Sequence, residues 1–169
     1  TSDGVVKAEH ALSASGSQGI GIVCDVRDPA SVQRAVETVI ARFGGLDVPV
    51  NCAGVGVGVP IAEMPHDEWD RILGTNLTGV FNCCKAAIPH LKTRGGGWIV
   101  NISSLSSTNP FPGGAAYCAS KAGLNAFSDA LMQELRDDNI RVTTVLPGSV
   151  ATGFSGRTAG SGADWKLLP

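Results

Sequence analysis

Short apolar runs alternate along the chain with segments in which apolar residues recur every three or four positions. The apolar runs predict strands at residues 20–23, 46–52, 98–102 and 141–146. The periodic segments predict helices at residues 5–13, 29–43, 67–92 and 115–138. Strands that are apolar throughout and separated by helices indicate a parallel sheet covered on both faces. The pattern therefore predicts an α/β fold with a doubly wound parallel sheet.

The helix at 29–43 has the clearest boundaries. Asp28 is a preferred N-cap residue, Pro29 fits the first helical position, and Gly44-Gly45 would end the helix. The segment 16–21 has glycines spaced like part of a phosphate-binding loop. No predicted strand precedes it and no helix follows it before Asp25, so we interpret it as a turn. The Gly-, Ser- and Thr-rich segment 152–162 predicts a loop.

Composition narrows the class of protein. The chain has 169 residues, 43% of them hydrophobic and 17% charged, which indicates a globular domain rather than a disordered segment. A net charge of −2 gives no reason to expect nucleic acid or an acidic membrane as a partner. No apolar run approaches the ~20 residues that span a bilayer.

The cysteines and histidines suggest no disulfide framework and no metal site. The five cysteines are odd in number and form no Cys-x-x-Cys pair. Four lie in apolar or Ala-rich stretches, which predicts buried thiols in a reducing compartment, most simply the cytoplasm. His10, His66 and His90 match no metal-ligand spacing.

Polar and glycine-rich clusters follow four predicted strands. They are Asp25, Asn51–Gly54, Ser103-Ser104 and Pro147-Gly148. Because ligands of open α/β sheets bind outside the carboxyl ends of the strands, we expect these clusters to share one rim.

Tyr117 and Lys121 are the pair of side chains in the sequence that is best suited to acid/base chemistry. Four residues apart, they share one face of the predicted helix, and an ammonium beside a phenol favours the phenolate. Such a phenol is a candidate general acid/base. Taken without context, the pair also fits an amphipathic helix with a surface lysine.

Five motifs, in order, resemble those of the short-chain dehydrogenase/reductase family, in the classical type that includes the 3-oxoacyl-acyl-carrier-protein reductases. They are Asn51-Cys52-Ala53-Gly54, Asn76-Leu77-Thr78-Gly79, Asn101-Ile102-Ser103-Ser104, Tyr117-Cys118-Ala119-Ser120-Lys121-Ala122 and Pro147-Gly148-Ser149-Val150-Ala151-Thr152. The resemblance runs over nearly the whole chain. It implies a Rossmann-like fold and hydride transfer between a nicotinamide cofactor and a ketone or secondary alcohol.

The resemblance implies four catalytic residues. Tyr117 would be the general acid/base, and Lys121 would favour its phenolate and bind the nicotinamide ribose. Ser104 would hold the substrate oxygen. Asn76 would position a water that relays protons towards Lys121, or would only mark a kink in a long helix.

The resemblance also implies NAD or NADP as the cofactor and a set of residues to bind it. The set is Asp3, Asp25, Val26, Asn51, Ala53, Gly54, Tyr117, Lys121, Pro147, Gly148, Val150 and Thr152. Asp3 favours NAD if it is the acidic residue that ends the family's second strand, whereas a terminal aspartate without a role is the alternative. The helices near 76–92 and 115–138 correspond to the family's usual interface, which implies a homodimer or homotetramer.

The chain departs from the family's pattern at both ends. The first two strands with their glycine-rich turn, and the last helix and strand, are not found, so residues 1–169 are expected to form a single, incomplete Rossmann-like domain. The strand at 20–23 would then lack a parallel neighbour, and Pro49 stands where the family has an apolar residue. Two functions follow: an NAD(P)-dependent oxidoreductase, or a catalytically inactive fragment that acts as an oligomerisation or interaction module.

Overall fold

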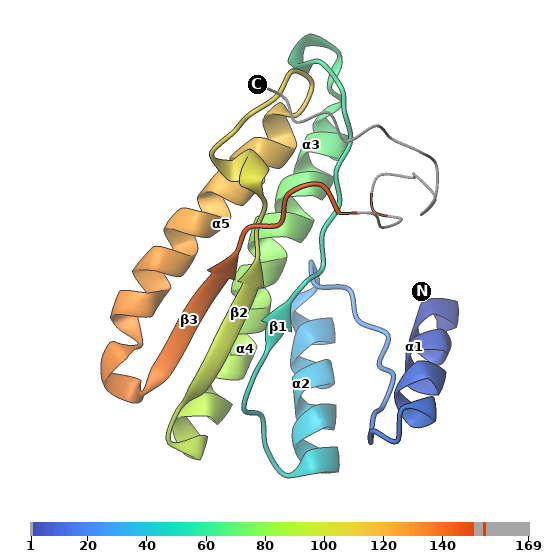
Figure 1. Cartoon of the computed structure of the whole chain (residues 1–169), viewed down its shortest axis with the longest axis vertical. Coiled ribbons are helices and arrows are strands. Elements are labelled where there is room, and N and C mark those ends of the chain that lie inside the picture. Colours follow the sequence, from blue (N-terminus) through green and yellow to red (C-terminus); the bar gives the residue numbers. More distant parts are fainter. Residues whose placement is uncertain (1, 151–153, 155–169) are drawn as a thin grey trace.

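Three parallel strands and the helices that join them make up the fold. The computed structural model describes residues 2–150 and Phe154. The strands β1 (Val50–Asn51), β2 (Gly97–Ile102) and β3 (Ile140–Val145) lie in the order β1-β2-β3 (Figure 1). The helices are α1 (Ser2–Ala14), α2 (Pro29–Phe43), α3 (His66–Leu73), α4 (Gly79–Arg94) and α5 (Ala115–Glu134). Four short helical turns join them: η1 (Ile61–Glu63), η2 (Gly74–Thr78), η3 (Leu105–Ser107) and η4 (Arg136–Asp138).

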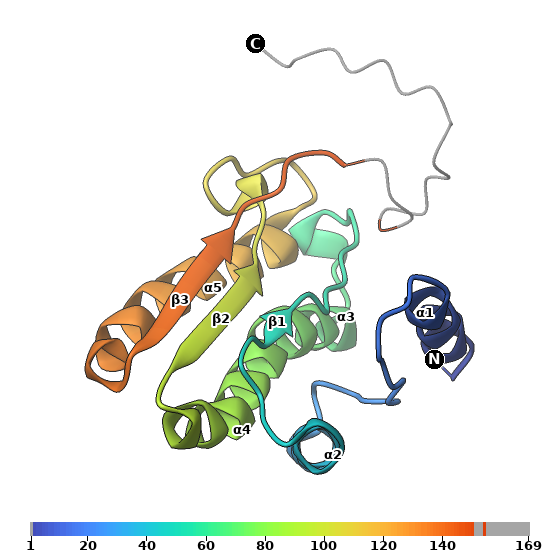
Figure 2. The ribbon, with the colours of Figure 1, turned by 60° about the horizontal axis from the view of Figure 1, so that its bottom comes forward.

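Helices α4 and α5 cover one face of this sheet (Figure 2). The core lies between that face and the two helices. Ile99 of β2 and Ile140 of β3 point to that face and are buried. The apolar side of α5 predicted from the sequence is confirmed, since it packs into the same core. Its members are Leu124, Phe127, Leu131 and Leu135.

The opposite face of the sheet is open among the described residues. Val50, Trp98 and Val145 are 56%, 46% and 42% exposed, although all three belong to strands. They alternate along their strands with the residues that face α4 and α5, as the two-residue period of a strand requires. The described residues therefore place helices on one face, where the apolar runs of the sequence predict cover on both.

The predicted strand at 20–23 is wrong, because no strand forms between α1 and α2. A strand needs a hydrogen-bonded neighbour, and β1, β2 and β3 pair only with one another. The segment packs against α1 instead: a Cβ on Gly19 would lie 2.6 Å from Leu12 Cδ1, and one on Gly21 would collide with Val5. The predicted turn before it is confirmed, and Gly16 takes a φ of +77° there.

Strand β1 is shorter than the predicted 46–52, and Pro49 gives the reason. The carbonyls of Asp47 and Pro49 accept hydrogen bonds from Trp98 N and Val100 N, so both residues turn their backbone groups towards β2. In a parallel strand the N–H of a residue points to the same side as its C=O, and proline has no N–H. Pro49 therefore removes one bond of the β1–β2 ladder, and regular pairing is confined to Val50 and Asn51.

The predicted boundaries of α2 are confirmed. The Asp28 side chain accepts a hydrogen bond from Ala30 N, and Gly44 ends the helix at a φ of +77°. The long helix predicted at 67–92 is divided into α3 and α4 by a π-helical turn, η2, which contains Asn76. Such turns often mark functional sites.

A row of buried polar side chains connects the strands β1 and β2 to α5. Asn51 Nδ2 donates to Asn101 Oδ1 over 2.8 Å, and Asn101 Nδ2 donates to Ser128 Oγ over 2.9 Å. Ser128 Oγ in turn donates to Leu124 O. Asn101 is fully buried, so this row fixes the short strand β1 to β2 and β2 to α5 in one register.

We expect Asn101→Ala to lower the free energy of unfolding by about 2 kcal/mol, because it leaves the buried Asn51 amide with only the weak acceptor Cys84 Sγ. Urea unfolding measures the change. Thr143→Ala, an exposed position on the open face, is the control and should change the free energy by less than about 0.5 kcal/mol. An equal effect of the two variants would contradict the structural role of the row.

Candidate active site

Tyr117 and Lys121 lie one turn apart on α5, as predicted. The Lys121 Nζ is 5.9 Å from the centre of the Tyr117 ring. Tyr117 is half-buried, and its ring lies 6.1 Å from that of Phe154. A Cβ on Gly56 would lie 3.1 Å from the Tyr117 ring, so the glycine-rich turn after β1 packs directly on the tyrosine.

Lys121 is buried to an extent that is unusual for a lysine. Only 4% of it is exposed, and its Nζ donates to Ile102 O over 2.7 Å at the carboxyl end of β2. Burial lowers the pKa of the Lys121 ammonium, and the Cys52 thiol partly opposes this effect. Lysine is almost never buried without a reason, so this ammonium is a strong candidate for a functional group.

Ser104 lies two residues beyond the end of β2 and caps the turn η3. Its Oγ accepts a hydrogen bond from Ser106 N over 3.1 Å, which leaves the hydroxyl proton available for another acceptor. Ser103, the preceding residue, donates from its Oγ to Lys121 O over 3.2 Å. The strand end that carries Ser104 is therefore attached to the helix turn that carries Lys121.

Asn76 is fully buried in η2 and connects two parts of the site. Its Oδ1 accepts from Val55 N over 2.8 Å, and its Nδ2 donates to Val55 O and Ser120 Oγ. Ser120 Oγ donates onward to Tyr117 O. Asn76 thus fixes the glycine-rich turn after β1 to the first turns of α5.

Gly54 lies where these groups converge. A Cβ at Gly54 would be 3.6 Å from Asn76 Oδ1 and 3.8 Å from Lys121 Nζ. A Cβ at Gly54 would therefore lie within van der Waals distance of both polar groups.

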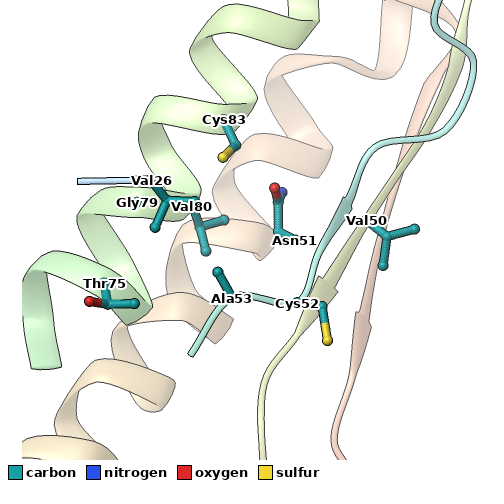
Figure 3. A pocket seen from close by; sticks show the side chains of 9 residues that line it. All are labelled: Val26, Val50, Asn51, Cys52, Ala53, Thr75, Gly79, Val80 and Cys83. Atoms are coloured by element: carbon teal, nitrogen blue, oxygen red, sulfur yellow. The ribbon is translucent and has the colours of Figure 1, made fainter. Parts of the chain in front are cut away.

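A small cleft opens beside the end of β1. Its volume is about 70 Å³, and it is lined by residues that include Val26, Asn51 and Ala53 (Figure 3). Asn51 and Ala53 point towards α4, whereas Val50 and Cys52 point to the other side of the strand. Ligand pockets usually exceed about 300 Å³, so these residues form one wall of a site rather than an enclosed pocket.

Asp25 lies at the outer edge of this region and is half exposed. Arg27 donates three hydrogen bonds to its carboxylate, from Nε, Nη2 and the backbone N. These bonds lower the pKa of Asp25 to about 2. The next residue, Val26, is held in place by Asn82, whose Nδ2 donates to Val26 O.

The predicted cofactor residues Pro147, Gly148 and Val150 do not line the small cleft. Pro147 O accepts from Leu105 N over 3.0 Å, and Gly148 packs near the Leu105 side chain, so both lie beside η3. Val150 is 62% exposed. Asp3 lies in the first turn of α1, and Thr152 lies outside the described residues.

Sequence reasoning missed several polar residues that hold the site together: Asn82, Ser120, Asn125 and Ser128. A usable signal existed for Asn82, which follows Gly79 by one helical turn. A Cβ on Gly79 would approach Val26 Cγ2 to 2.6 Å, so this glycine permits the close contact in which Asn82 reaches Val26. The prediction of buried thiols is wrong for Cys24 and Cys52, which are exposed; all five cysteines are free.

A tyrosine, a buried lysine and a serine thus lie near the carboxyl edge of the parallel sheet in a Rossmann-like α/β fold. The family model described as short chain dehydrogenase matches residues 1–160. The chain therefore belongs to the short-chain dehydrogenase family.

Curated relatives agree with this membership. D-threitol dehydrogenase of Mycolicibacterium smegmatis is 42% identical over 132 residues, which cover 78% of this chain and 51% of that protein. The 3-oxoacyl-[acyl-carrier-protein] reductase FabG of Staphylococcus aureus is 36% identical over 141 residues, which cover 83% of this chain and 57% of that protein. The chain thus spans little more than half the length of these relatives.

Solved structures share the fold. An NAD+-bound xylitol dehydrogenase superposes with a TM-score of 0.87 at 33% identity, covering 91% of this chain and 60% of the other. A metagenomic short-chain oxidoreductase in complex with NADP superposes with a TM-score of 0.80 at 38% identity, covering 86% and 67%. Among the described residues no helix is long and apolar enough to cross a membrane. The same part of the chain contains no cluster of three or more potential metal ligands.

We expect Lys121→Met to retain stability. At neutral pH the free energy of unfolding should stay within about 1 kcal/mol of wild type or exceed it, because the variant no longer buries a charge. The folded-state pKa of Lys121 lies below the ordinary value of 10.5, so the unfolded state binds more protons between the two values. The wild-type protein should therefore gain stability relative to Lys121→Met as the pH rises through that interval.

Urea unfolding at neutral and alkaline pH measures both effects. A large loss of stability at neutral pH, or a wild-type advantage that shrinks as the pH rises, would contradict the assignment of Lys121 as a buried, costly charge.

Proposed function

We propose that this chain carries the catalytic residues of an NAD(P)-dependent oxidoreductase that interconverts a ketone and a secondary alcohol. The observation that supports this most is the burial of the Lys121 ammonium beside the Tyr117 ring, with the Ser104 hydroxyl proton free nearby in the fold. Burying an ammonium carries a desolvation cost, and proton transfer at a neighbouring phenol gives a reason for accepting that cost.

The residues of the rim fit a dinucleotide in part. Asp25, Val26, Asn51, Ala53 and Gly54 would border its adenosine side and central part, and the small cleft lined by Val26, Asn51 and Ala53 supports this. Lys121 would bind the nicotinamide ribose. Pro147, Gly148, Val150 and Thr152 would border the nicotinamide carboxamide. When bound, the nicotinamide supplies or accepts the hydride.

In the direction of reduction, Ser104 donates its hydroxyl proton as a hydrogen bond to the substrate carbonyl oxygen. One lone pair of this hydroxyl oxygen accepts from Ser106 N, and the hydroxyl proton is available to the substrate oxygen. Tyr117 transfers its phenolic proton to the same oxygen as the carbonyl carbon gains a hydride. Lys121 stabilises the phenolate that remains. Asn76 then positions a water that returns a proton towards Lys121.

The names of the relatives narrow the choice of substrates and cofactors to test. Two of them are named for threitol and xylitol, which makes small polyols with NAD+ the first substrates to test. A β-ketoacyl thioester is the second choice, after FabG, and it should be tested with both NADH and NADPH. Asp3 favours NAD only if it binds the adenosine ribose.

The proposal extends to assembly and location. Phe81 on α4 and Met132 on α5 are 45% and 48% exposed, which supports a homodimer or homotetramer through these two helices. The five free thiols support a reducing compartment such as the cytoplasm.

The competing proposal is an inactive fragment that serves as an oligomerisation module. It requires α4 and α5 but gives no reason to keep the Lys121 charge buried. The two proposals differ in turnover: the oxidoreductase has it and the inactive module does not.

We expect Tyr117→Phe to lower kcat/KM by a factor of about 10² to 10⁴ and to leave the Kd of NADH within about twofold of wild type, because only the proton donor is removed. The change in nicotinamide absorbance measures turnover, and nicotinamide fluorescence measures binding. Ala119→Ser, an exposed change on the same helix, should leave both unchanged. Retained turnover in Tyr117→Phe would refute the role of Tyr117, and a wild-type protein without turnover would favour the inactive module.

A further inference from the structure

The turn η3 decides where the Ser104 hydroxyl points. Ser106 N donates to Ser104 Oγ, while Ser107 N and Ser107 Oγ both donate to Ser104 O, the latter over 2.6 Å. Ser104 is therefore held by the residues that follow it as well as by strand β2. If η3 shifts, the hydroxyl of Ser104 shifts with it.

Asn125 attaches this turn to α5. It lies one helical turn beyond Lys121, and its Nδ2 donates to Ser107 Oγ over 2.8 Å. The contact continues through Ser107 Oγ to Ser104 O, so two hydrogen bonds join α5 to the backbone of Ser104. Two further hydrogen bonds between α5 and this region, from Ser103 Oγ to Lys121 O and from Lys121 Nζ to Ile102 O, hold the strand end before Ser104.

The Asn125 side chain is not arranged for maximum stability. Its Oδ1 is buried and accepts no hydrogen bond, the only such side-chain atom among the described residues. An unsatisfied buried carbonyl is costly, and an apolar side chain of similar size would avoid that cost. An asparagine at this position therefore needs a reason other than stability, and its one engaged group points at Ser107.

We propose that Asn125 is a positioning residue, which fixes η3 through Ser107 and thereby orients the Ser104 hydroxyl towards the substrate oxygen. The inference rests on the proposed function. It assigns to α5 a third task beside carrying Tyr117 and Lys121, because the same helix then sets the distance between the serine and the tyrosine.

Four variants test the proposal: Asn125→Leu, Ser107→Ala, their double variant, and Ser107→Thr, which keeps the hydroxyl. Gln133→Leu, an exposed amide on the same helix, is the matched control. In Asn125→Leu we expect kcat to fall about tenfold. The Kd of NADH should not rise, and the urea midpoint should not fall. In Ser107→Ala and in the double variant, kcat should fall by about the same factor as in Asn125→Leu. All three variants break the same connection, which runs from Asn125 through Ser107 Oγ to Ser104 O. Ser107→Thr and Gln133→Leu should keep wild-type kcat.

Amide hydrogen exchange gives a readout that does not depend on turnover. Exchange at Ser107 and Thr108, whose N–H groups close η3, should become about tenfold faster in Asn125→Leu and remain unchanged in Gln133→Leu. Unchanged exchange in Asn125→Leu, or a kcat equal to wild type, would overturn the proposal. An inactive wild-type protein would contradict the proposed function, while hydrogen exchange would still decide whether Asn125 fixes η3.

Discussion

The site depends on a reciprocal pair of hydrogen bonds between the end of β2 and α5. Lys121 Nζ donates to Ile102 O, and Ser103 Oγ donates to Lys121 O. Each element thus offers a side chain to the backbone of the other; the serine bond is buried and the lysine bond is partly buried, and the low dielectric of such a region strengthens hydrogen bonds. Because Ser104 follows Ser103 directly and Tyr117 precedes Lys121 by one turn, this pair brings the serine and the tyrosine to the same edge of the sheet.

An apolar core, which lies further from the carboxyl edge of the sheet, offsets the energetic cost of the polar contacts at that edge. Ile99, Leu91, Leu124 and Ile140 pack between the sheet and the two helices, and they supply the burial that drives folding. Towards the carboxyl ends the same layer becomes polar, with Asn101 and Asn76 fully buried and hydrogen-bonded. Such a layer stabilises less than aliphatic side chains would, but its directional bonds define single positions for the groups they hold.

Much of this architecture could be predicted from local pattern. The helix caps at Asp28 and Gly44 and the apolar side of α5 follow from short-range rules, and the structure confirms them. The predicted strand at 20–23 is wrong because local pattern does not supply the paired neighbour that a strand needs, and the comparison with the family's pattern itself indicates that this neighbour is missing. The effect of Pro49 depends on which side of the strand faces β2, which is a property of the register. Asn125 was not visible as a site residue, since its partner lies 18 residues away in a turn whose shape only the structure shows.

The central claim is that this edge of the sheet binds a nicotinamide cofactor for proton-coupled hydride transfer. Its most direct measurement is a titration of the purified protein with NADH and with NADPH, followed by nicotinamide fluorescence. The account predicts saturable binding of at least one of them, weakened in Lys121→Met, in which the ribose loses its hydrogen-bond donor. No saturable binding at millimolar concentrations of either cofactor would contradict the account for this chain.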